Sequence, residues 1–240
     1  METNMMVSAV IAFGALFAVM YMVLKKYTYP AVEQPFFSDP AFFKLMTLGL
    51  VAGTGILAGY TFFQSDGGWA SIFVAVAFAM IFELVKLVIL NLKRFHGKSD
   101  TLFYGFGLGI GIGGAFAFGF SFYGSSATSA FIGGDDIMMW FLFAVISVQT
   151  VLLNSATGMT IGEGIARRRP TEFFMQALII SVSYQLLMSQ VWAGHSEMMT
   201  YAFLTIAFLL SFGYFYQIIY IKLPKVIREV VRARKKDMPL

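Results

Sequence analysis

The chain contains no cysteine, so disulfides, thiolate metal sites and a cysteine nucleophile are all excluded. Charge is also scarce. Only 12% of the 240 residues are Asp, Glu, Lys or Arg, whereas ordinary soluble domains carry about a quarter. Hydrophobic residues make up 58% of the chain, more than a soluble fold of this size could hide. Because a bilayer is itself an apolar solvent, the composition predicts a multi-pass protein of the cell membrane.

Seven apolar runs are long enough to cross a bilayer, which takes about 20 helical residues. Helices are expected because lipid offers no partner for open backbone groups. We therefore expect an all-α fold with a seven-helix transmembrane domain at 1–223 and a basic cytoplasmic tail at 224–240. The expected spans are roughly 5–24, 42–64, 69–92, 101–123, 137–160, 172–193 and 199–221.

Charge alternates between the connections of these runs. The first, third and fifth connections and the tail are basic, whereas the second, fourth and sixth contain no Lys or Arg and hold the acids Asp66, Asp135, Asp136 and Glu197. Because basic loops stay in the cytoplasm, the pattern predicts an outer N-terminus and a cytoplasmic C-terminus. The tryptophans all fall at predicted outer helix ends, where indole favours the interface: Trp69, Trp140 and Trp192.

The net charge of +4 does not indicate nucleic acid, because the basic residues lie in short connections and not on one surface. The expected partners are the lipid bilayer and another membrane protein. In the tail, Val226, Ile227 and Val231 alternate with Arg228 and Arg232. That pattern is typical of an amphipathic basic helix, which either lies on the inner membrane surface or is a solvated tail that orients the protein.

Two charges lie within the third run. Glu83 and Lys86 are three residues apart, so they share a helix face and can pair. The pair is either a catalytic or ion-handling site, since charges inside membranes usually face the bundle interior, or a structural ion pair whose lysine reaches toward the cytoplasmic interface. With Asn154 and Gln185 it forms a candidate polar intramembrane cluster, although neutral amides are poor general bases.

Glycines recur every four residues in the fourth run, in two registers. One contains Gly105, Gly109 and Gly113, and the other contains Gly107 and Gly111. Small residues at this spacing let another helix approach closely. The partner helix could belong to this bundle or to a foreign protein.

Histidine is nearly absent. His96 falls in an expected inner connection and His195 in an outer one, so they cannot share a site. No metal site and no cofactor are therefore expected.

The order of three short motifs resembles the PrsW-type intramembrane protease family. That family belongs to one superfamily with the CAAX prenyl proteases and the Aph-type (anterior-pharynx-defective) subunit of γ-secretase. The resemblance covers about residues 75–195. Its motifs are Phe82-Glu83-Leu84-Val85-Lys86, Asp100-Thr101-Leu102-Phe103-Tyr104-Gly105 with the glycines that follow, and Asn154-Ser155-Ala156-Thr157-Gly158.

The chain departs from the protease pattern at several positions that would carry its catalytic groups. Phe82 stands where the family has the first of two glutamates, and about Phe116 where it has another. Asn154 replaces a motif histidine, and a second one falls near Tyr184 or Gln185. One remaining carboxylate, Glu83, cannot both activate water and be balanced by a second acid or base.

The Aph-type subunit is the closer match in character. It shares the length, the seven helices, the orientation, the glycine series and an Arg-Arg-Arg after the fifth helix, here Arg167, Arg168 and Arg169. The resemblance implies a non-catalytic scaffold for another membrane protein, with a presenilin-type intramembrane protease as one candidate. Two alternatives stay open: a divergent PrsW-like protease that uses Glu83, and a small transporter or channel lined by the polar cluster.

Overall fold

The computed structural model describes residues 2–28, 32, 36–63, 69–127, 136–191, 193 and 196–236. Every element in this part of the chain is helical, and seven helices are long and apolar enough to cross a membrane, which confirms the expected helical class. They are α1 (Glu2–Leu24), α2 (Asp39–Phe62), α3 (Trp69–Leu90), α4 (Thr101–Ala127), α5 (Asp136–Ala166), α6 (Pro170–Val191) and α7 (Glu197–Tyr216). Four residues used above, Asp66, Asp135, Trp192 and His195, lie outside the described residues.

Helix α5 extends six residues beyond its expected end at 160. It stops in a Schellman motif, in which the N–H of Arg168 donates to the carbonyl of Ile165 (3.1 Å) and the N–H of Arg169 to that of Gly164 (2.7 Å). Arg168 has φ of 58°, in the left-handed region where glycine is the usual residue. The end of α5 is thus set by a local turn and not by the thickness of a membrane.

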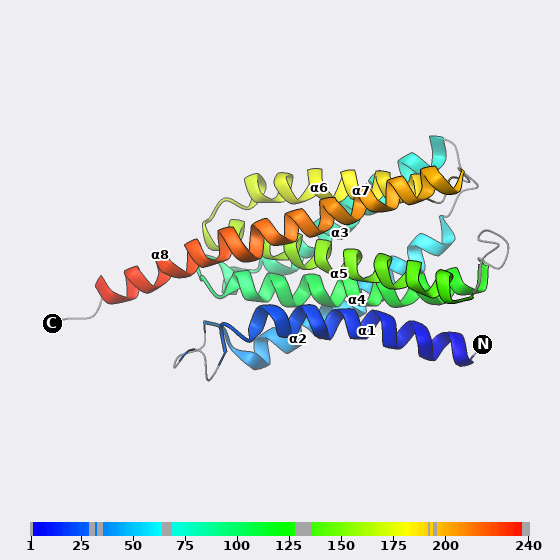
Figure 1. Cartoon of the computed structure of the whole chain (residues 1–240). Helices are drawn as coiled ribbons and strands as arrows, with labels where there is room; N and C mark the ends of the chain where they lie inside the picture. Colours follow the sequence, from blue (N-terminus) through cyan, green and yellow to red (C-terminus); the bar gives the residue numbers. More distant parts are fainter. Residues whose placement is uncertain are drawn as a thin grey trace.

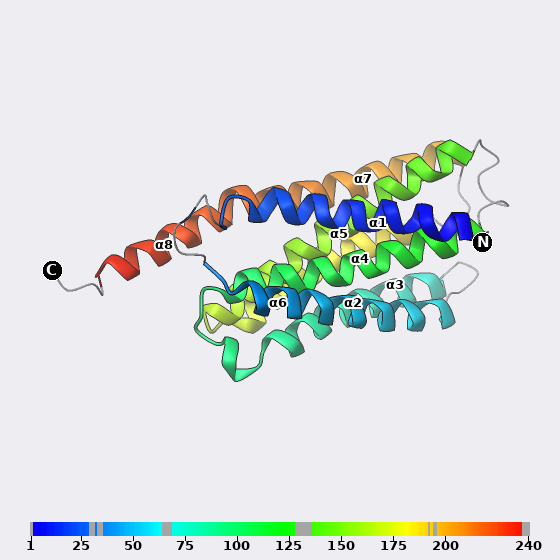
Figure 2. The same ribbon diagram turned by 90° about the horizontal axis from the view of Figure 1, so that it is seen from below.

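The C-terminal tail is helical and continuous with α7. A π-helix, η3 (Gln217–Lys222), joins α7 to α8 (Leu223–Lys236) without a break at the expected boundary of 223 and 224. Pro224 has no N–H and crowds the preceding turn, and the N–H of Leu223 donates to Ile218, five residues back. The tail is helical as expected, but it continues the line of α7 beyond the bundle and does not turn across its end (Figures 1 and 2).

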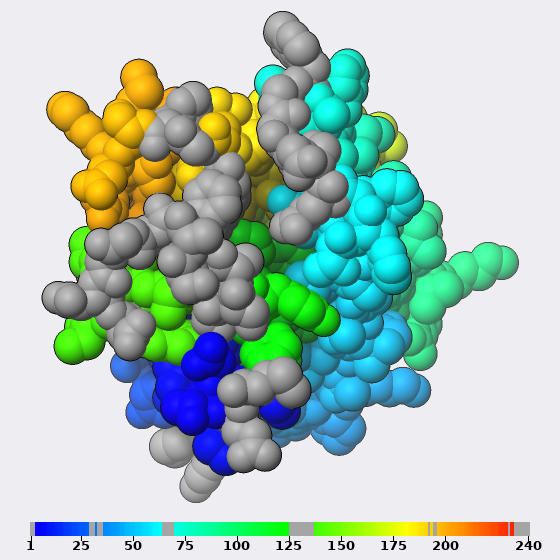
Figure 3. Space-filling view, turned by 90° about the vertical axis from the view of Figure 1, so that its right-hand side faces the viewer, coloured from blue at the N-terminus to red at the C-terminus, as the bar shows by residue number. Residues whose placement is uncertain are grey.

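The bundle is built around α4. About 94% of its most apolar stretch is buried, against 22–33% for α1, α2, α3, α6 and α7. Helices α1 and α2 lie on one side of the α4–α5 pair, and α3, α6 and α7 lie on the other (Figure 1). Seen end-on, the starts of α1 and α7 lie on opposite sides (Figure 3). The start of α1 and the end of α8 lie at opposite ends of the molecule (Figure 1).

One glycine register of α4 packs against α5. A Cβ at Gly105 would overlap the carbonyl oxygen of Gly158, and one at Gly109 would overlap that of Asn154. At Gly113 a Cβ would lie 3.0 Å from the Cα of Val151. Only glycine permits this approach of the two backbones.

The other register packs against α2. A Cβ at Gly111 would overlap the carbonyl oxygen of Met46, and one at Gly107 would lie 3.0 Å from the Phe42 ring. Both glycine registers of α4 therefore serve contacts inside the bundle, and neither is open to a foreign helix.

Candidate functional site

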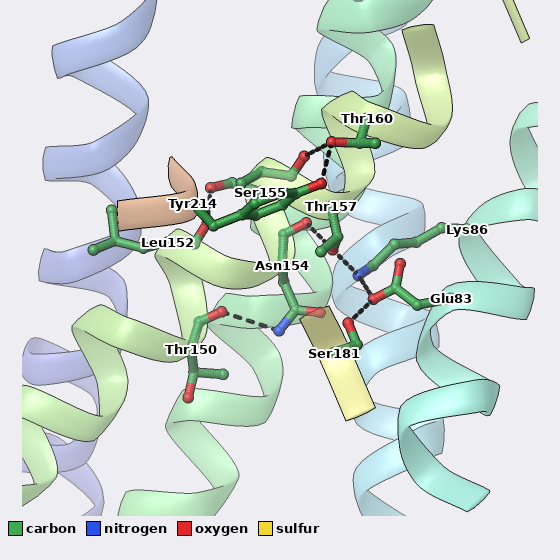
Figure 4. Close-up of polar contacts among 11 residues, drawn as sticks. Glu83, Lys86, Thr150, Leu152, Asn154, Ser155, Thr157, Thr160, Ser181 and Tyr214 are labelled. Carbon is green, nitrogen blue, oxygen red and sulfur yellow. Dashed lines mark hydrogen bonds and ion pairs between the residues drawn. The ribbon is translucent and has the colours of Figure 1, made fainter. Parts of the chain in front are cut away.

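The buried charges of α3 form an ion pair. Lys86 Nζ lies 2.8 Å from Glu83 Oε1, and both side chains are 0% exposed. Two neighbouring helices complete the contacts: Lys86 donates to the Thr157 hydroxyl of α5 (2.7 Å), and the Ser181 hydroxyl of α6 donates to Glu83 Oε1. Figure 4 shows these groups converging between the three helices. The lysine points into the bundle, so the expectation that it reaches toward the interface is wrong.

A buried ion pair is stable only when other protein groups satisfy its remaining hydrogen-bond donors and acceptors, because both ions have lost their hydration water. Two of the three ammonium donors of Lys86 have partners. Glu83 Oε1 accepts from both Lys86 and Ser181, whereas Oε2 has no hydrogen-bond donor among the described residues. The site therefore has zero net charge and one open acceptor.

The structure brings only part of the expected cluster together. Asn154 lies beside the pair, since its backbone oxygen accepts from Thr157 (3.3 Å), but its side chain donates to the carbonyl of Thr150 (3.0 Å). Gln185 is half-buried on α6 and makes no hydrogen bond to the described residues. Asn154 is thus a neighbour of the ion pair, and Gln185 is not part of it.

The groups that do complete the site are hydroxyls. Thr157 and Ser181 stand out in the sequence only as polar residues in apolar helices, a signal they share with several others. Their positions could be predicted only from the packing of α3 against α5 and α6. Two further hydrogen bonds between hydroxyls join α5 to its neighbours: Thr150 to Tyr184 of α6 (3.0 Å) and Thr160 to Tyr214 of α7 (2.7 Å).

An aromatic pair occupies the adjacent part of the core. Phe82 of α3 and Phe116 of α4 are 2% and 6% exposed, and their rings meet edge to face with centroids 5.0 Å apart. Tyr60 of α2 also packs edge to face on Phe116 (5.7 Å). The residue before Glu83 therefore contributes an apolar contact and no chemistry.

A second polar group lies where α5 meets α8. Arg167 donates to Glu163 of its own helix (2.8 Å) and to Glu229 of α8 (2.9 Å). Burial alone would lower the pKa of Arg167, but the hydrogen bonds and charges of the two carboxylates outweigh it and raise the pKa. These residues line a cavity of about 160 Å³ together with Gly97, Ser99, Leu102, Ala166 and Val226. Its lining carries two carboxylates and one guanidinium.

Within the described residues, no three His, Cys, Asp or Glu side chains are grouped so that they could hold a metal ion. Comparison with protein-family models, curated proteins and solved structures finds no match to this chain. The described residues define an all-helical protein with seven helices long and apolar enough to span a membrane, and with an ion pair, Lys86 and Glu83, buried among α3, α5 and α6. Its function has to be inferred from that geometry.

Proposed function

We propose that the protein is a non-catalytic membrane scaffold that binds another integral membrane protein. The observation that carries this proposal is the closed state of Glu83. This carboxylate is held by Lys86 and Ser181 and is 0% exposed. Side chains of three helices meet at these contacts, so the role of the ion pair is to hold α3, α5 and α6 together.

The aromatic pair supports the same proposal. If the resemblance to PrsW-type proteases holds, Phe82 and about Phe116 stand where that family has carboxylates. Here the two side chains pack on each other with ring centroids 5.0 Å apart. A hydrolase needs a second titrating group beside the first, and these positions supply hydrocarbon. On the same resemblance, the partner would be a membrane protein such as a presenilin-type protease.

In the orientation that goes with this proposal, the start of α1 lies outside the cell and α8 lies in the cytoplasm. The described basic residues of the connections and of α8 lie together at the end of the bundle where α1 and α3 finish and α6 begins (Figure 1). Basic termini of spanning helices stay on the cytoplasmic side. Single cysteines introduced at Ser99 and at Ser196 test this orientation. Only the cysteine at position 196, on the outer side, should react with an impermeant maleimide in intact cells, and reaction at position 99 instead would invert the orientation.

The decisive experiment is mass spectrometry of the protein purified from its native membranes in a mild detergent. A scaffold should carry another integral membrane protein in fixed stoichiometry. A chain that purifies alone, as monomer or homo-oligomer, would overturn the proposal.

One observation favours a second candidate, a divergent intramembrane hydrolase. Glu83 Oε2 has no hydrogen-bond donor among the described residues, as an acid awaiting a substrate or water would. A peptidase assay of the wild type beside Glu83→Gln tests it, with Glu163→Gln as a control that removes a different buried carboxylate. A Glu83→Gln protein with full activity would eliminate this candidate. The transporter alternative gains no support, because Glu83 and Lys86 are closed to solvent.

A further inference from the structure

The last turns of α1 carry an exposed row of side chains that changes in character along the helix. Phe17, Tyr21 and Lys25 are spaced by four residues and are all exposed. The N–H of Lys25 donates to the carbonyl of Tyr21 (3.1 Å), so the helical turn is kept and the row shares one face. Lys25 Nζ lies 5.4 Å from the centroid of the Tyr21 ring. The row thus passes from a hydrocarbon ring to a phenol and then to a cation.

A matching row runs along α7 and η3. Phe212, Tyr216 and Tyr220 are exposed and also spaced by four residues, and the rings of the two tyrosines stack with their centroids 5.0 Å apart. The basic residues Lys222 and Lys225 follow them in the chain. Tyrosine is enriched where the hydrocarbon of a bilayer meets the headgroups, so both rows place that boundary next to the basic end of the bundle.

The two rows meet at this end. Lys26 Nζ lies 4.9 Å from the centroid of the Tyr220 ring, so a cation–π contact joins the end of α1 to η3. Helices α1 and α7 lie farther apart at their starts and approach each other toward the basic end (Figures 1 and 2), and α5 contacts both of them. The two lysines after α1 and the tyrosines of η3 therefore belong to one surface.

The charge of this surface is not balanced by the described residues. Lys25 and Lys26 form no ion pair with a described carboxylate, because the described ion pairs use other cations: Lys86, Arg167 and Arg169. A tyrosine ring attracts an ammonium group but leaves its three N–H donors for other acceptors. In the orientation proposed above, the two lysines face the cytoplasmic leaflet, which carries anionic lipids. A lipid phosphate has both the charge and the acceptors that they lack.

We propose that Lys25, Lys26 and Tyr220 form a binding site for the headgroup of one anionic phospholipid. The two lysines contact its phosphate, and its acyl chains lie along the exposed rings of α1 and α7. Basic sites between membrane helices on the cytoplasmic side recognise anionic headgroups in this way. The site uses none of the contacts of Glu83, so it goes beyond the scaffold function, and either proposal can hold without the other.

Native mass spectrometry of the protein in detergent, with lipid added, tests the proposal. The wild type should form a one-to-one adduct with phosphatidylglycerol at least about fivefold more abundant than with phosphatidylcholine, because one basic residue near an anionic headgroup contributes about that factor. Lys25→Gln/Lys26→Gln should abolish this preference. The matched control is Lys44→Gln/Lys93→Gln, which removes two exposed lysines that contact no ring or carboxylate among the described residues. It should keep the preference.

Three outcomes would overturn the site. Equal losses in the two double variants would mean that the whole basic end attracts lipid, and equal adducts with the two lipids would mean that headgroup charge plays no part. Displacement of the lipid by glycerol 1-phosphate at the same concentration would mean a site for small anions. Lys25→Arg/Lys26→Arg should retain the preference, and both glutamine variants should keep the wild-type melting temperature without lipid. If Lys25→Gln/Lys26→Gln is unstable, the wild-type comparisons still decide.

Discussion

Lys86 and Thr157 are 71 positions apart in the chain, and a 2.7 Å hydrogen bond between their side chains joins α3 to α5 inside the bundle. Without Thr157 and Ser181, the ion pair of Lys86 with Glu83 would have only its own helix to satisfy it. The ion pair is thus part of the tertiary structure and not only a feature of α3.

Removing one member of the pair should cost more than removing both. Lys86→Met leaves the buried Glu83 without its counter-ion, and we expect a loss of about 3–5 kcal/mol in unfolding free energy. The double variant Glu83→Gln/Lys86→Met restores neutrality and should recover a large part of that loss. Unfolding curves in detergent measure the difference. If the loss in the double variant equals the sum of the losses in the Lys86→Met and Glu83→Gln single variants, the two side chains do not stabilise each other.

Leucine at Gly109 should disrupt the bundle, because a Cβ there would overlap the carbonyl oxygen of Asn154. We expect a loss of about 3 kcal/mol or failure to fold, at or above the usual range for overpacking. Gly55→Leu is the matched control, since a Cβ at Gly55 meets no atom within 4 Å. Melting temperature and monodispersity in detergent compare the two, and similar behaviour of the variants would contradict the packing of α4 on α5.

Arg168→Gly should stabilise the protein. Arg168 holds the left-handed position at the end of α5, with φ of 58°, where a side chain costs about 1 kcal/mol relative to glycine. The expected gain in unfolding free energy is about 0.5–1 kcal/mol, less what glycine adds to the flexibility of the unfolded chain. Arg169→Gly, outside the left-handed region, is the control and should bring no gain. A destabilised Arg168→Gly variant would mean that the guanidinium makes contacts worth more than the strain.

Arg167→Gln should release α8 from the bundle. The variant loses the ion pairs to Glu163 and Glu229. The Arg167 and Glu229 side chains are 41% and 60% exposed, and the new amide can still donate a hydrogen bond to the nearly buried Glu163, so the effect on overall stability should stay near about 1 kcal/mol. Amide hydrogen exchange should rise in residues 223–232 and remain unchanged in α4. Added salt should increase exchange in the wild type and have little further effect on the variant. Unchanged exchange in α8 would show that Leu223 and Val226 alone hold the helix in place.

The sequence by itself determined the helical class and the number of helices. Both follow from local quantities: the length of each apolar run and the charges between runs. The spacing of Glu83 and Lys86 likewise sufficed to predict that the two could pair, because residues three apart on a helix are neighbours whatever surrounds them.

The tertiary structure decided which residues complete the site and which face of each helix is free. It placed Thr157 and Ser181 on the ion pair, left Gln185 out, and filled both glycine registers of α4 from within. These outcomes depend on the rotation and packing of helices far apart in the chain, which hydropathy does not encode. The continuation of α7 through the π-helix into α8 is another such outcome, because a basic amphipathic sequence is compatible with a helix that extends from the bundle or with one that lies across its end.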